Sequence, residues 1–231
     1  MTGERMVEAG IAAVAGAALG AAAGSLVGIG VPAALVAGVN GLISGHRRIY
    51  HWKSRDGLIA FVLDSTWALG TTTAGLAAHA AGAMRGKPGF SAALSERQNR
   101  HVYERGFQPR KGFAVTLGNV ISGTGDLGKP RRAKLVTDHE NVHAWQARGF
   151  GPLYPVLYAG WMAGGAGMGA VVWTIARRDE PFRKVVESCA YYLNPFEYWA
   201  YSRDANWPPP GLVRNLGWKK PAVRSFASFR Q

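Results

Sequence analysis

The chain has 231 residues, 48% of them hydrophobic, and its 27 Lys and Arg against 14 Asp and Glu give a formal net charge of +13. Such a charge favours anionic lipid head groups or nucleic acid as partners, but no recognisable nucleic-acid-binding module accompanies it, so we expect membrane lipid and no nucleic acid. The single cysteine, Cys189, excludes an intrachain disulfide framework, and we interpret it as a buried structural thiol. The apolar residues gather in three blocks, which favours membrane segments attached to a smaller soluble unit.

The first apolar block covers residues 10–45 and is almost free of charge. It is long enough to cross a bilayer once, or to fold as a tight hairpin at residues 28–32. Glycine recurs every four residues, at Gly16, Gly20, Gly24 and Gly28, which gives a face of bare backbone that another helix can approach closely. We expect a retained membrane segment and a helix–helix oligomer through these glycines. The alternative is an Ala/Gly-rich helix buried against the rest of the chain.

The second apolar block, residues 57–84, follows a basic and aromatic stretch typical of the flank of a membrane helix. It is apolar enough to span a bilayer but contains Asp64, which is costly there unless it lies near a helix end or is hydrogen-bonded inside a bundle. We therefore interpret residues 1–84 as a membrane-associated helical region. Residues 85–231 would form a second region with an apolar insertion at 153–176.

The stretch from residue 85 to residue 134 has the character of a soluble domain. Residues 101–107 and 113–121 are two β-favouring runs joined by a Pro- and Gly-containing loop, which predicts a hairpin. A helix is then expected to begin near Lys134 or Thr137 and to stop at Gly149. The sequence thus predicts an α+β fold, mostly helical, with Gly/Ala-rich membrane-type helices and a small β-hairpin or sheet.

The predicted helix contains the motif H-E-x-x-H, formed by His139, Glu140 and His143. Residues four apart share a helix face, so both imidazoles can reach one metal ion while the glutamate lies at its edge. This pattern indicates a Zn²⁺ site with an open position for water, where Glu140 would take the water's proton. A capping box with Thr137 as the N-cap and Glu140 closing back on it is the alternative, and it would explain the glutamate but neither histidine.

A zinc site with three protein ligands needs one more, and Glu197 is our first candidate because an Asn-Pro pair begins a helix just before it. Glu187 is the second candidate. The H-E-x-x-H motif followed by Glu197-x-x-Ala200 resembles the gluzincin metallopeptidases, over residues 113–204. This resemblance implies a zincin-like metal helix, zinc-dependent peptide hydrolysis, and a downstream glutamate as the third ligand.

The resemblance also implies roles for residues near Glu197. These peptidases usually have an aspartate after the alanine, where this chain has Tyr201. Asp204, one turn later, could replace that aspartate in a hydrogen bond to a ligand histidine, and Tyr201 or Arg203 could face the reacting carbonyl. In the same family a strand before the metal helix binds extended substrate. Residues 112–121 occupy that place here, either for this purpose or only to support the helix.

The third apolar block, residues 153–176, imposes a topological constraint because it is long enough to span. If it crossed once, the histidines and Glu197 would face opposite sides of the membrane and could not share an ion. We therefore expect either a re-entrant hairpin broken at Gly164-Gly165 or a helix buried in the protein or along the interface; otherwise Glu197 is not a ligand. Basic clusters flank all three blocks, so counts of Lys and Arg do not fix the orientation.

The leading hypothesis is a membrane-associated zinc metallopeptidase that acts on a peptide or protein, most simply in a bacterial inner or cytoplasmic membrane. The first alternative is a non-catalytic glycine-zipper membrane protein that acts by oligomerisation or insertion. The second is a delivered toxin whose zincin unit attacks a target cell.

Overall fold

The computed structural model describes residues 2–86, 89–109, 112–204 and 207–222. The chain forms two compact units, Met1–Pro152 and Leu153–Gln231. Its fold is α+β, as predicted: mostly helical, with one small three-stranded sheet. The compositional change at residue 84 falls inside the first unit, where α4 packs against β2 and β3.

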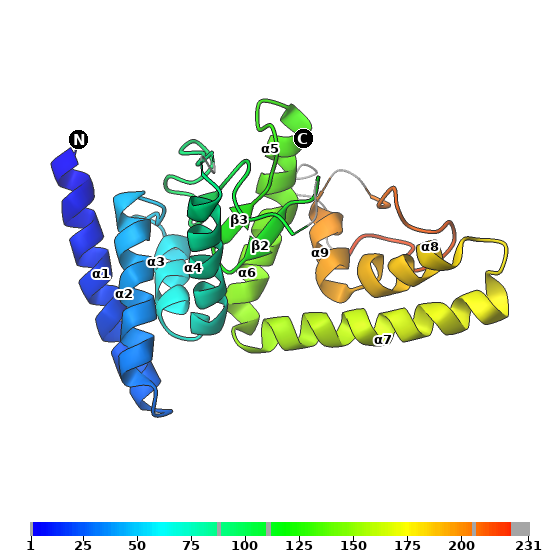
Figure 1. Cartoon of the computed structure of the whole chain (residues 1–231), viewed down its shortest axis with the longest axis horizontal. Coiled ribbons are helices and arrows are strands. Elements are labelled where there is room, and N and C mark those ends of the chain that lie inside the picture. Colours follow the sequence, from blue (N-terminus) through cyan, green and yellow to red (C-terminus); the bar gives the residue numbers. More distant parts are fainter. Residues whose placement is uncertain (1, 87–88, 110–111, 205–206, 223–231) are drawn as a thin grey trace. The chain divides into compact units, whose positions relative to one another are not determined.

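The first apolar block folds as a helical hairpin (Figure 1). Helix α1 covers Thr2–Ser25 and helix α2 covers Gly30–His46, and Gly28 turns the chain between them at a φ of 77°. The glycine face lies inside this hairpin: a Cβ on Gly20 would stand 2.5 Å from the Ala33 carbonyl oxygen, and one on Gly16 would stand 2.7 Å from that of Ala37. The close helix approach expected from these glycines therefore occurs within the chain.

This contact predicts opposite effects for two identical substitutions in α1. Gly20→Ala should destabilise the hairpin, because the new methyl group would overlap the backbone of α2 and force the helices apart. Gly10→Ala should leave stability unchanged or raise it by up to about 1 kcal/mol, because its Cβ meets nothing within 4 Å and alanine is the better helix former. Thermal unfolding in detergent measures both. Equal midpoints would contradict the close packing.

The second apolar block forms two helices rather than one. Helix α3 covers Arg55–Ser65, with the Ser54 hydroxyl accepting from the Gly57 backbone at its N-terminus, and helix α4 covers Leu69–Met84. Neither reaches the length of a membrane span. Two helices in the described part of the chain are long and apolar enough to cross a membrane, Gly3–Ser25 within α1 and Leu153–Ala176, designated α7.

The sheet differs from the predicted hairpin. Strand β1 (His101–Val102) pairs in parallel with β3 (Val120–Ser122), and β2 (Val115–Leu117) pairs antiparallel with β3, giving the order β1-β3-β2. The hairpin thus lies within the run 113–121, whose pattern predicts a single strand. Gly118, at a φ of 57°, turns the chain there in a conformation that favours glycine.

The helix that carries the H-E-x-x-H motif is longer than predicted. It begins with α5 (Pro130–Lys134), continues as a π-helical segment η1 (Leu135–Glu140), and ends as α6 (Asn141–Phe150). Gly151, at a φ of 53°, follows the last turn. The π-helical segment contains His139 and Glu140, and π-helical insertions of this kind occur frequently at functional sites.

The second unit is built on α7, an unbroken helix of 24 residues. The predicted break at Gly164-Gly165 is therefore wrong. Helix α8 (Phe182–Glu187) and the π-helical segment η2 (Ser188–Tyr192) return along α7, and α9 (Pro195–Arg203) follows them (Figure 1). Gly165 permits this return rather than a bend, since a Cβ there would stand 2.6 Å from the Cys189 carbonyl oxygen. Cys189 is a buried free thiol, as predicted.

Candidate metal centre

The two histidines of the motif face one another on the continuous helix of α5, η1 and α6, the candidate metal helix. Their Nε2 atoms lie 3.2 Å apart, and both side chains are buried. At the usual Zn–N distance of about 2.0–2.1 Å, this separation corresponds to an N–Zn–N angle of about 100–106°, close to tetrahedral. The pair therefore fits two ligands of one zinc ion with little adjustment of either side chain.

Gln146 orients one of these two histidines. Its Oε1 lies 2.8 Å from Nδ1 of His143, so that Nδ1 donates to the amide oxygen and the lone pair of Nε2 points towards His139. A hydrogen bond to the distal nitrogen commonly fixes the tautomer of a metal-binding histidine. Gln146 was missed in the sequence, although its position three residues after His143 places it on the same helix face.

The carboxylate of Glu140 is hydrogen-bonded by a residue of the sheet. The hydroxyl of Thr116, in β2, donates to Oε2 of Glu140 at 2.6 Å, and the carboxylate is buried. The capping-box interpretation is wrong: Thr137 lies within the helix, and its hydroxyl bonds Lys134 and Asp138. Glu140 is thus positioned beside the histidine pair by a residue that local sequence could not identify.

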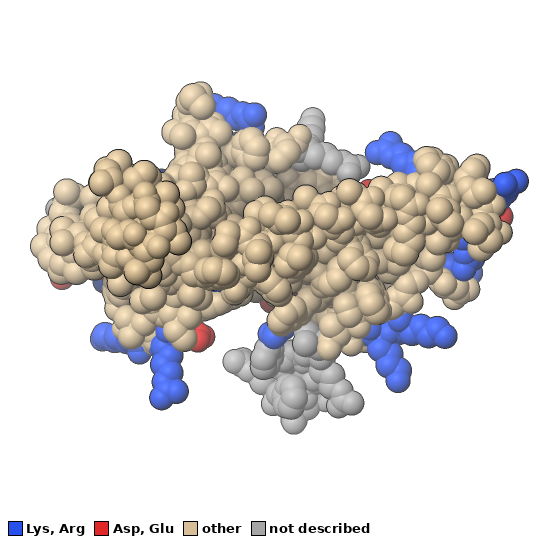
Figure 2. Space-filling view, turned by 90° about the horizontal axis from the view of Figure 1, so that it is seen from below, with Lys and Arg blue, Asp and Glu red and all other residues tan. Residues whose placement is uncertain are grey.

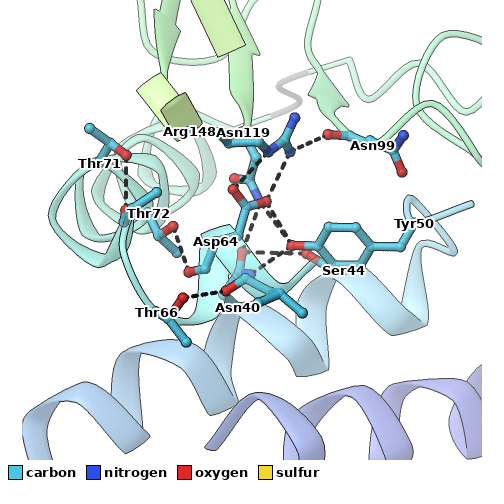
Figure 3. Close-up of polar contacts among 12 residues, drawn as sticks. Asn40, Ser44, Tyr50, Asp64, Thr66, Thr71, Thr72, Asn99, Asn119 and Arg148 are labelled. Atoms are coloured by element: carbon cyan, nitrogen blue, oxygen red, sulfur yellow. Dashed lines mark hydrogen bonds and ion pairs between the residues drawn. The ribbon is translucent and has the colours of Figure 1, made fainter. Parts of the chain in front are cut away.

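A buried ion pair anchors the metal helix at its other end (Figure 3). Arg148 of α6 donates to both carboxylate oxygens of Asp64 at 2.8 and 2.9 Å, and each side chain is only 1% exposed. Tyr50 and Asn119 also donate to Asp64. Both conditions expected for this acid are met, because it is the penultimate residue of α3 and is hydrogen-bonded inside a bundle.

The charge state of this cluster follows from its surroundings. Burial alone would lower the pKa of Arg148, but Asp64 opposes this and the pKa is raised. Burial raises the pKa of the Tyr50 hydroxyl, and Asp64 raises it further. Arg148 is therefore a permanent cation and Tyr50 a neutral donor, which together offset the desolvation of the buried carboxylate.

Strand β2 supplies a second feature beside the histidine pair. It lies at the edge of the sheet, with β3 on one side and, among the described residues, no strand on the other. Because Thr116 of this strand bonds Glu140, β2 lies directly against the metal helix. An extended peptide could add to such an edge by main-chain hydrogen bonds.

In the second unit, Glu197 lies in the first turn of α9 and is buried among tyrosines. The Tyr158 hydroxyl donates to its Oε1 at 2.7 Å. Burial raises the pKa of Tyr191 well above its ordinary value, and the Glu197 carboxylate and Tyr201 raise it further. As predicted, Asn194 starts this helix, its side chain accepting from the Phe196 backbone.

Glu197 and Glu187 lie at different heights along α7 in the second unit. Tyr158 lies in the second turn of α7. Glu197 is bonded to this tyrosine, near the start of α7. Glu187, in contrast, follows Val186, which packs at Gly169, about 24 Å along the helix from Leu153.

Glu197 lies beside the early turns of the straight helix α7, because α8 and η2 return along that helix. Tyr201 lies on α9 with its ring near Tyr191 and Tyr192, and Asp204 is the C-cap of the same helix. The ligand role of Glu197 and the roles of Tyr201 and Asp204 stay predictions.

No protein-family model, curated protein or solved structure matches this chain.

Proposed function

We propose that the chain is a membrane-associated zinc-dependent metallopeptidase, with His139, His143 and Glu197 as zinc ligands and Glu140 as general base. The observation that carries this proposal is the facing pair of histidine Nε2 atoms, with Gln146 behind His143. A helix needs neither a buried histidine pair nor a glutamate held by another element for its own stability. Zinc peptidase chemistry needs both.

Each residue has a separate task in this mechanism. When bound, zinc would polarise the scissile carbonyl and activate a water molecule. Glu140, held at Oε2 by Thr116, would accept a proton at Oε1 and pass it to the leaving amine. Gln146 would keep His143 in the tautomer that presents Nε2. Tyr201 would face the reacting carbonyl, Asp204 would support a ligand histidine, and the edge of β2 would hold the substrate as an extended strand.

The metal centre is tested by the zinc content of purified protein. The parent should hold one zinc per chain, and His139→Ala and His143→Ala should each lose it, because two protein ligands hold zinc weakly. His46→Ala is the matched control, since this exposed histidine at the end of α2 should leave zinc content unchanged. Parent protein without zinc after metal supplementation would contradict the proposal and favour the non-catalytic glycine-zipper alternative.

A further inference from the structure

The first unit separates its exposed charges from its apolar surface along the helix axes. Glu8 pairs with Arg48 and Arg97, and Arg5 pairs with Glu96, in a charged ring where α1 begins and α2 ends. The opposite end consists of three connections, residues 25–30, 66–68 and 149–152, and none contains Asp, Glu, Lys or Arg. Viewed from below, the middle of this end of the first unit shows no charged side chains, and basic and acidic side chains lie at its margin (Figure 2).

The three connections lie at the same end of the first unit, because contacts between their helices hold them side by side. A Cβ on Gly16 of α1 would lie 3.6 Å from the Ser65 hydroxyl at the end of α3. The Trp67 indole donates to the carbonyl oxygen of Gly149 at the end of α6. From the level of Gly16, α1 continues for nine residues to Ser25, or about 14 Å, so the α1–α2 turn projects beyond the other two connections.

The projecting tip is apolar and bare of protein. Leu26 is 88% exposed, and Val27 and Val31 are exposed to a similar degree. The exposed apolar surface continues along α1 and α2 to the charged ring, through Met6, Val7, Ile11, Val14, Leu35, Val39 and Leu42. Soluble monomers rarely expose long contiguous apolar surfaces, so a surface of this kind indicates an apolar partner.

The dimensions and charges match a lipid bilayer. The part of α1 between Glu8 and Ser25 spans seventeen residues, or about 26 Å. This length is close to the roughly 30 Å thickness of a hydrocarbon core. Lys53 and Arg55 are exposed near the charged ring, at the height where anionic head groups would lie. We propose that the α1–α2 hairpin enters a bilayer tip first and does not cross it, with both of its ends on the same side as the metal helix.

The same geometry sets the height of the histidine pair. Arg148 is paired with Asp64 and therefore lies at the same height. Counted from Arg148 towards the charged end of the helix, His143 lies five residues away, or about 8 Å, and His139 nine residues away, or about 14 Å. The charged ring at Glu8 lies about 12 Å from Gly16 in the same direction. The metal centre therefore faces the membrane surface and not the hydrocarbon. The insertion of the α1–α2 hairpin is argued without any residue of the site, so it stands or fails separately from the peptidase proposal.

Cysteine labelling tests the topology in the full chain with Cys189 replaced by alanine. Single cysteines at Gly3, Lys53 and Leu26 would be treated with a membrane-impermeant maleimide in spheroplasts and in inverted vesicles of a bacterial host. Gly3→Cys and Lys53→Cys should both react in one of the two preparations, the same one for each. Leu26→Cys should react in neither preparation until detergent is added. Reaction of Leu26→Cys in the opposite preparation would show crossing, and reaction in the same one would place the tip in water. Either result overturns the proposal.

Two further measurements separate lipid from a second protein copy as the partner of the tip. A fluorophore on Leu26→Cys should be quenched by spin labels on the lipid acyl chains, and one on Lys53→Cys should not. Leu26→Asp should lower partitioning into equimolar phosphatidylcholine and phosphatidylglycerol vesicles by about a hundredfold. Met84→Asp is the matched control, because Met84 is 83% exposed at the charged end. An unquenched tip, or equal partitioning of the two aspartate variants, would overturn the proposal.

Discussion

Glu140→Gln is expected to keep stoichiometric zinc and to lower the rate of peptide cleavage by about 10²–10⁴-fold, the usual contribution of a general base. The amide has nearly the same shape, and its oxygen can still accept the hydrogen bond from Thr116, so the metal helix should keep its structure. It cannot accept a proton from water. Zinc content and cleavage of a mixed peptide substrate would be measured on the same preparation.

Asp138→Asn is the matched control for this variant. Asp138 is the neighbouring acid on the same helix, paired with Lys134 and bonded to Thr137. The control should retain both zinc and activity. If Glu140→Gln cleaved as fast as the control, Glu140 would not be the base. If it lost zinc as well, its role would be to support the metal centre and not to transfer a proton.

The features that the sequence predicts correctly depend on local pattern. The spacing of His139 and His143 places them on one helix face, and their facing Nε2 atoms agree with this. The uncharged block around Gly28 allows a single crossing or a tight hairpin at residues 28–32, and the structure has the hairpin. Because a lone carboxylate is costly among apolar helices, Asp64 predicts a place near a helix end or a hydrogen bond inside a bundle, and the structure has both.

The features that the sequence did not predict depend on contacts between distant segments. Nothing near Asp64 identifies Arg148 as its partner, 84 positions later in the chain. Thr116 reaches Glu140 only because β2 packs against the metal helix. Gly118 and Gly165 show how a glycine can be misinterpreted: the first turns a run that looked like one strand, and the second admits a neighbouring backbone without breaking α7.

The buried ion pair connects the apolar helices to the helix that carries the candidate metal centre. Asp64 belongs to α3, beside the α1–α2 hairpin, and Arg148 follows His143 by five residues on α6. Asn40 of α2 and Asn119 of the sheet join the same cluster, with a 3.0 Å hydrogen bond between their side chains (Figure 3). The height and rotation of the metal helix are thus fixed against the surface that we propose faces lipid.

Arg148→Met is expected to lower the free energy of unfolding by about 3–5 kcal/mol, because it leaves Asp64 buried without its cation. Lys134→Met on the same continuous helix is the control. Its pair with Asp138 is 3.9 Å long with 52% and 31% of the two side chains exposed, so solvent screens it and the loss should stay below about 1 kcal/mol. Denaturant unfolding followed by circular dichroism measures both.

A double substitution separates the ion pair from simple packing. Asp64→Asn combined with Arg148→Met removes both charges, so the double variant should be more stable than Arg148→Met alone. If the arginine acted only by filling space, adding Asp64→Asn would not recover stability.

Because the pair sets the position of α6, Arg148→Met should also release zinc at a lower denaturant concentration than the parent, while Lys134→Met should not. Zinc release that matched the parent would show that the metal centre holds its geometry without this anchor.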